Sequence, residues 1–158
     1  MKRVLVALLM ILSAATARAE TKPFGRGSWA ELVAAHAGRP LVVHFWSLGC
    51  APCLAEMPQW GELARANPGL ALVLVSTDPM DQAPRQAQVL GRAGLGGVES
   101  WSFADPFADR LRFEVDRRWR GELPMTRLVG RDGTAQSVTG AVDVPAWLAG
   151  QGGTDERR

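Results

Sequence analysis

The sequence predicts an α/β fold in which a mixed central sheet is flanked by helices on both faces. Two continuous apolar runs, 41–46 and 70–76, are typical of strands that are covered on both sides. Segments with helical spacing separate these runs, and such alternation favours parallel strands. Arg131-Asp132-Gly133 is a turn signal between two short strand-like segments, so we expect the chain to end in an antiparallel hairpin.

The first predicted helix begins at Ser28, because Ser28 and Glu31 have the spacing of a capping box. Gly38 is expected to end this helix. After the strand 41–46, a second helix is predicted over 51–66. Pro58 should kink it, since proline has no N–H to donate inside a helix.

The remaining elements continue the alternation, and the segment 114–122 is charge-rich without a clear period. We expect helices over 82–93, 106–113 and 144–149, and strands over 101–104, 125–129 and 134–139.

The first nineteen residues have the layout of a secretory signal peptide. A basic start precedes the apolar run 4–15, and Ala17-Arg18-Ala19 supplies small residues for cleavage after Ala19. The alternative is an uncleaved N-terminal anchor, although the run is short for a membrane span of about 20 residues. We therefore expect one domain over 20–150 and a polar, disordered tail over 151–158.

Charge gives no indication of a nucleic-acid partner. The full chain has 18 basic and 16 acidic side chains, but the basic excess lies in the signal segment. Residues 20–158 carry 15 basic and 16 acidic side chains, a formal charge of −1. A chain of this length can build a core without disulfide or metal staples.

The two cysteines, Cys50 and Cys53, are three residues apart. A disulfide that closes so short a loop adds little stability, so the pair is better explained by redox chemistry. Cys50 lies where a buried strand ends and a helix begins, and unpaired N–H groups there favour a thiolate. We expect Cys50 to attack substrates and Cys53 to resolve the mixed disulfide. Half of a zinc site is the alternative, but only His36 and His44 could complete it.

Residues 45–58, Phe-Trp-Ser-Leu-Gly-Cys-Ala-Pro-Cys-Leu-Ala-Glu-Met-Pro, resemble the active-site segment of exported thioredoxin-like proteins of the TlpA/ResA/CcmG group. Leu123-Pro124-Met125-Thr126, followed by Arg131-Asp132-Gly133, is similar to that group's cis-proline loop and the turn after it. The resemblance covers about residues 25–150. It implies a thioredoxin-like fold, a redox-active disulfide between Cys50 and Cys53, and no other cofactor or metal.

The resemblance also implies two further site residues. Pro124 would be a cis-proline beside the disulfide, where the substrate backbone docks; the alternative is an ordinary proline at a strand entry. Glu56 would assist proton transfer, and it lies one helical turn after Cys53. The alternative for Glu56 is a solvated glutamate on the helix surface.

Two positions depart from the group's pattern. Gly49 stands where the group usually has tryptophan, which leaves the attacking sulfur less covered. His44 stands where thioredoxins often carry a buried acid and this group often has asparagine. His44 could take the proton of Cys53, or it could be a core histidine with satisfied hydrogen bonds.

The resemblance implies that this protein reduces disulfides of exported proteins in the periplasm or another extracytoplasmic space. We expect a membrane electron donor and a monomer. The alternatives are an oxidase that introduces disulfides and a metal-handling chaperone; a peroxidatic motif is not apparent. Six arginines could form a basic rim for an acidic partner or an ordinary solvated surface: Arg110, Arg112, Arg117, Arg118, Arg120 and Arg127.

Overall fold

The computed structural model describes residues 19–151. The predicted signal segment up to residue 18 and the predicted tail from residue 152 lie outside the described residues. Within the described part of the chain, no helix is long and apolar enough to cross a membrane.

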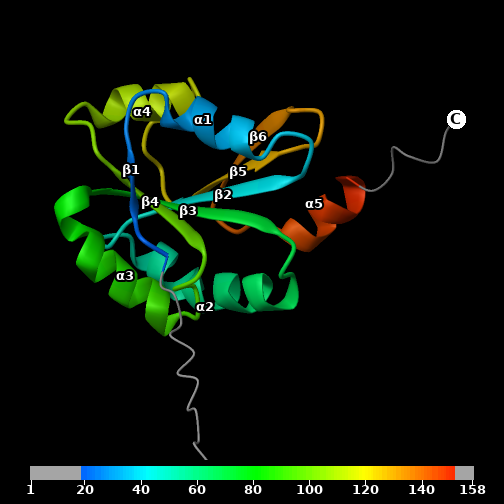
Figure 1. The fold of residues 1–158 in the computed structure, drawn as a ribbon, viewed down its shortest axis with the longest axis horizontal. Coiled ribbons are helices and arrows are strands. Elements are labelled where there is room, and N and C mark those ends of the chain that lie inside the picture. Colours follow the sequence, from blue (N-terminus) through cyan, green and yellow to red (C-terminus); the bar gives the residue numbers. More distant parts are fainter. Residues whose placement is uncertain (1–18, 152–158) are drawn as a thin grey trace, which may run out of the picture.

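A six-stranded mixed sheet forms the centre of the molecule (Figure 1), in the order β1-β4-β3-β2-β5-β6. The strands from β1 to β2 in this order pair in parallel, and β5 and β6 add an antiparallel hairpin beside β2. This arrangement confirms the predicted mixed sheet. The strands are β1 (Lys22–Phe24), β2 (Leu41–Trp46), β3 (Ala71–Pro79), β4 (Glu99–Phe103), β5 (Met125–Val129) and β6 (Ala135–Thr139).

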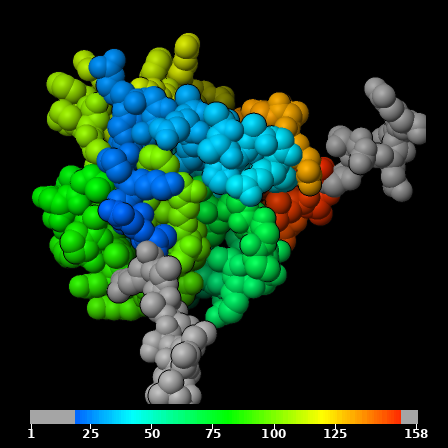
Figure 2. All heavy atoms as spheres, in the orientation of Figure 1, coloured from blue at the N-terminus to red at the C-terminus, as the bar shows by residue number. Residues whose placement is uncertain are grey.

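Helices cover both faces of the sheet. In Figure 1, α1 (Ser28–Ala35) and α4 (Ala108–Val115) lie above it, while α2 (Ala51–Ala66) and α3 (Ala83–Arg92) lie below. Figure 2 shows the segments of α1 and α4 side by side on the upper face. The 3₁₀ turn η1 (Met80–Gln82) precedes α3, and α5 (Val144–Gln151) packs against the apolar cluster below the sheet.

The central strand β2 divides the core into two apolar clusters. Leu41, Val43 and Phe45 join the cluster under α1 and α4, whereas Val42 and Trp46 join the one beneath α2 and α3. Successive side chains of a strand point to opposite faces, so His44 faces α2 with Val42 and Trp46. All six residues of β2 are buried, as a strand covered on both faces requires.

The start of α1 corrects the predicted capping box. Gly27 is the N-cap of α1, with φ at 83°, and no side chain caps the helix. The Ser28 hydroxyl instead accepts a hydrogen bond from the backbone N–H of Gly25 at 3.0 Å. The N–H of Glu31 donates to the carbonyl oxygen of Gly27 at 3.1 Å. Ser28 therefore shapes the turn before the helix.

Sequence periodicity missed β1 and gave several boundaries only approximately. β1 has three residues, which is too short to show an alternation, and it is held by parallel pairing with β4. β3 runs to Pro79, beyond the predicted end at residue 76. In contrast, the predicted bounds of β2, α2 and β5 agree with the structure.

Gly61 allows α2 to lie close to the end of α3. A Cβ atom at position 61 would lie only 1.8 Å from the carbonyl oxygen of Ala93. Backbone atoms at such a distance cannot be accommodated without moving one of the two segments. The absence of a side chain at Gly61 thus permits the close approach of α2 to the segment that ends α3.

Candidate active site

Cys50 and Cys53 lie at the edge of the sheet where β2 ends. Cys50 is the N-cap of α2, and its Sγ accepts a hydrogen bond from the backbone N–H of Cys53 at 3.2 Å. The two cysteines form a disulfide with an S–S distance of 2.07 Å. This position at the positive end of the helix dipole favours a thiolate on Cys50 once the disulfide is reduced.

The two sulfur-bearing residues differ in their exposure. Cys50 is partly exposed, whereas Cys53 has no exposed surface and packs within the apolar cluster that contains Trp46 and Trp60. A substrate can therefore reach Cys50 from solvent, while Cys53 is positioned to act from within. Pro52 occupies the first turn of α2, where a missing N–H leaves no helical bond unmade.

Asp78, near the end of β3, fixes the loop that leads to Cys50. Its Oδ2 accepts a hydrogen bond from the N–H of Leu48 at 2.7 Å and another from the Ser76 hydroxyl at 2.8 Å. Sequence reasoning did not identify this residue. The sequence did contain a signal for Asp78, because it comes two residues after the apolar run 70–76. An acidic residue at the carboxyl end of one parallel strand lies at the same edge of the sheet as the loop after the neighbouring strand β2.

Pro124 precedes β5 at the same edge of the sheet. The Leu123–Pro124 peptide bond is cis and Pro124 is buried. Because Met125 pairs with Phe45 in the β2–β5 ladder, Pro124 lies beside the end of β2, where the cysteine loop starts. Leu123 packs against the apolar cluster that includes Cys53.

Glu56 is turned toward the sheet. Its Oε1 lies 3.1 Å from Nε2 of His44 and accepts a hydrogen bond from the Trp60 indole N–H at 3.3 Å. The side chain is 19% exposed, so most of it is removed from water. Helical spacing placed Glu56 on the face of Cys53, but it did not predict the contact with His44.

His44 is fully buried between α2 and the sheet. Its Nδ1 lies 3.0 Å from the Thr126 hydroxyl oxygen, and its ring centroid lies 4.4 Å from that of Trp60. The distance from Nε2 to Glu56 is that of a hydrogen bond but the angle is poor, so this contact is mainly electrostatic. Burial lowers the pKa of His44, and the nearby carboxylate of Glu56 opposes that shift only in part.

An open pocket of about 190 Å³ lies next to Glu56. It separates α2 from the loop that precedes α5. Glu56 and Trp60 therefore border both the buried His44 and this solvent-accessible space. The lining residues are Glu56, Gln59, Trp60, Leu63, Ala141, Val142, Val144 and Pro145.

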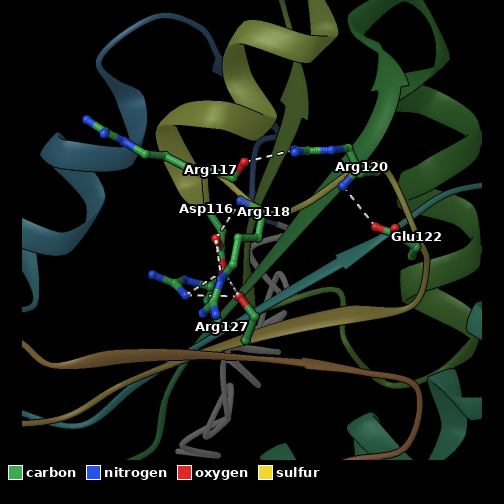
Figure 3. Close-up of polar contacts among 7 residues, drawn as sticks. Asp116, Arg117, Arg118, Arg120, Glu122 and Arg127 are labelled. Carbon is green, nitrogen blue, oxygen red and sulfur yellow. Dashed lines mark hydrogen bonds and ion pairs between the residues drawn. The ribbon is translucent and has the colours of Figure 1, made fainter.

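Several of the six arginines hold the segment before Pro124 in place. Figure 3 shows Asp116 between Arg118 and Arg127: its carboxylate accepts hydrogen bonds from the Arg118 N–H at 2.9 Å and from Arg127 Nη1 at 3.2 Å. Hydrogen bonds, first of all from the Ser137 hydroxyl, lower the pKa of Asp116. Arg120 donates to the Arg117 carbonyl oxygen. These bonds give the arginines a local structural role, and the predicted basic rim stays a prediction.

Among residues 19–151, no three or more His, Cys, Asp and Glu side chains are grouped so that they could hold a metal ion. His36 contacts Glu99, with 3.6 Å between Nε2 and Oε2, whereas His44 contacts Glu56. The two histidines thus have separate carboxylate neighbours.

The fold is thioredoxin-like, as predicted. A secreted disulfide oxidoreductase of Mycobacterium tuberculosis, homologous to E. coli DsbE, is 24% identical with a TM-score of 0.54, over 75% of this chain and 83% of that chain. A thiol:disulfide interchange protein of the thioredoxin family from Chlorobium tepidum is 18% identical with a TM-score of 0.57, over 76% and 82%. A DsbF homologue from Corynebacterium diphtheriae is 17% identical with a TM-score of 0.54, over 74% and 73%. No protein-family model and no curated protein matches the sequence.

The lowered pKa of His44 predicts a pH-dependent stability. Below the unfolded-state pKa of 6.5, the unfolded chain binds a proton at His44 that the folded protein does not yet bind. The contribution of His44 to stability is therefore complete above pH 6.5 and is lost as pH falls through the lower folded-state pKa. Urea unfolding between about pH 7.5 and pH 5.5 should show a steeper loss for wild type than for His44→Gln, by at most about 1.4 kcal/mol per pH unit. Parallel curves for the two proteins would contradict this.

Proposed function

We propose that this protein is a thiol–disulfide oxidoreductase that reduces disulfides of exported proteins through Cys50 and Cys53. The observation that carries the proposal is the pair itself: a partly exposed cysteine at the N-cap of α2, joined by a disulfide to a buried cysteine one turn later. Only the outer sulfur is accessible to a large substrate, and this asymmetry suits a two-step exchange.

In the first step, the Cys50 thiolate attacks one sulfur of the client disulfide. A bond forms between Cys50 and the client, and the second client sulfur leaves as a thiolate. In the second step, Cys53 loses its proton to the Glu56 carboxylate and attacks Cys50. The Cys50–Cys53 disulfide forms, the first client sulfur leaves, and two electrons have passed to the client.

Pro124 and its loop form the proposed docking edge for the client. The loop lies beside the end of β2. Pro124 has no backbone N–H, so at this position the chain donates no hydrogen bond to an adjacent strand. An extended client segment would pair with backbone groups next to the disulfide, as in other strand-addition complexes. The family resemblance supports the same role for this residue.

The reducing direction rests on the resemblance to the TlpA/ResA/CcmG group. An extracytoplasmic location would follow from cleavage after Ala19, and the structurally similar M. tuberculosis protein is itself described as secreted. There, the oxidised pair would need a membrane electron donor to return it to the dithiol. The protein would act as a monomer, and neither a metal nor a nucleic acid takes part.

An oxidase that introduces disulfides is the second candidate, because the same pair can run in either direction. Gly49 is the residue that favours this alternative. The residue is exposed, and nothing lies within 4 Å of the position that a Cβ would occupy. The attacking sulfur is thus less shielded than it would be beside a tryptophan.

The exchange can be tested by trapping. Cys53→Ser should accumulate a mixed disulfide between Cys50 and an oxidised client protein, because the resolving thiol is absent. Cys50→Ser should accumulate none, because Cys53 is buried. The products are measured by nonreducing electrophoresis and mass spectrometry of the linked peptides. Equal trapping by the two variants, or trapping through Cys53 alone, would contradict the assigned roles.

The direction can be tested by the reduction potential of the Cys50–Cys53 couple. Equilibration against glutathione should give a value well below about −200 mV, as expected for a reductase. A value near about −120 mV would favour the oxidase, because a strong oxidant has a stabilised dithiol form. The same titration on Gly49→Trp would show how much the missing tryptophan contributes.

A further inference from the structure

His44 is a buried ionisable residue that the two-step exchange does not use. The side chain faces α2 from the centre of the sheet and has no exposed surface. A histidine without partners would be costly here, because a buried polar group loses its hydrogen bonds to water. Each ring nitrogen has a polar neighbour: Thr126 at Nδ1 and Glu56 at Nε2.

The surroundings of His44 indicate where its proton lies. Thr126 faces it from β5, Leu74 pairs with it in β3, and α2 contributes Trp60, Cys53 and Glu56 to this face of the sheet. Among the described residues, Glu56 is the charged group that acts on His44. Neutral histidine has one N–H and one acceptor nitrogen, and a carboxylate opposite Nε2 favours the proton there. The Thr126 hydroxyl can then donate to Nδ1.

Glu56 lies between His44 and solvent. One side of Glu56 meets the buried ring, and the other borders the open pocket between α2 and the loop before α5. A proton that reaches Glu56 can therefore leave through the pocket. A proton on His44 has no such route, because Trp60 covers the ring and the side chain is fully buried.

We propose that His44 is a positioning residue for the resolving step: electrostatic attraction between its Nε2–H and the Glu56 carboxylate, whose Oε1 lies 3.1 Å from Nε2, holds that carboxylate against the sheet. The proposal rests on the function proposed above and adds a residue to it. The proton of the Cys53 thiol passes to the Glu56 carboxylate as Cys53 attacks Cys50, and it then leaves Glu56 for water in the pocket. His44 keeps its own proton throughout, so it acts as neither acid nor base.

The alternative role, in which His44 itself takes the proton of Cys53, gives a different chemical expectation. It requires an unprotonated Nε2 facing Cys53 and Glu56. It also creates a buried imidazolium, which burial disfavours. Glu56 has both the solvent access and the negative charge that a proton acceptor needs. His44 therefore stays neutral and serves as a donor to Glu56.

A mutant cycle with a small neutral disulfide tests this role. Reduced protein is mixed with excess dithiodipyridine, so that release of the first thiol reports attack by Cys50 and release of the second reports resolution by Cys53. His44→Leu and Glu56→Gln should each slow the second release roughly tenfold and leave the first nearly unchanged. The double variant should be no slower than either single variant, because both remove the same positioned carboxylate.

Controls separate this role from a general loss of structure. Glu62→Gln makes the same chemical change at an exposed position on α2 and should leave both phases unchanged. His44→Asn retains an N–H donor and should recover part of the rate lost in His44→Leu.

Two kinetic results would overturn the proposal: an unchanged second phase in His44→Leu, or a roughly hundredfold slowing in the double variant. Nitrogen-15 NMR of reduced wild type near neutral pH needs no variant and should show His44 protonated at Nε2 only. A proton on Nδ1 would equally overturn it. Failure of the function itself would appear differently, as the absence of the first thiol release from wild-type protein.

Discussion

The antiparallel pairing of β2 with β5 is the constraint on which the site depends. Its register sets Phe45 opposite Met125 and His44 opposite Thr126. The first pair brings Pro124 to the end of β2, where the cysteine loop starts, and the second supplies the hydroxyl beside the His44 ring. A slip of one residue would turn His44 to the opposite face of the sheet and separate it from Glu56.

The same strand also links the chemistry to the core. β2 is buried along its whole length, and its two neighbours, β3 and β5, bring Asp78 and Pro124 to the edge where α2 begins. The reactive end of α2 is thus held from two sides, while Gly61 permits close packing farther along the helix. Thiol–disulfide exchange is faster when the two sulfurs are held in the geometry of attack. The strands on either side of the partly exposed turn at Cys50 provide this support.

Local patterns were sufficient for the elements that carry the site. The apolar run of β2, the helix start at Cys50 and the turn after β5 each have a strong sequence signal, and their bounds agree with the structure. The start of α1 was predicted wrongly, because Gly27 and not Ser28 is its N-cap. β1 and the contact between His44 and Glu56 depend on residues far apart in sequence, so no local period could reveal them. The roles of Glu56 and Pro124 stay predictions.

The central claim is that the start of α2 makes Cys50, and not Cys53, the nucleophile. The most direct measurement is the pH dependence of alkylation of each cysteine in the reduced protein, followed by mass spectrometry under pseudo-first-order conditions. The account predicts that Cys50 reacts far faster, with an apparent pKa below the free-thiol value of about 8.5, while Cys53 remains protected. Equal rates for the two cysteines, or faster reaction of Cys53, would contradict it.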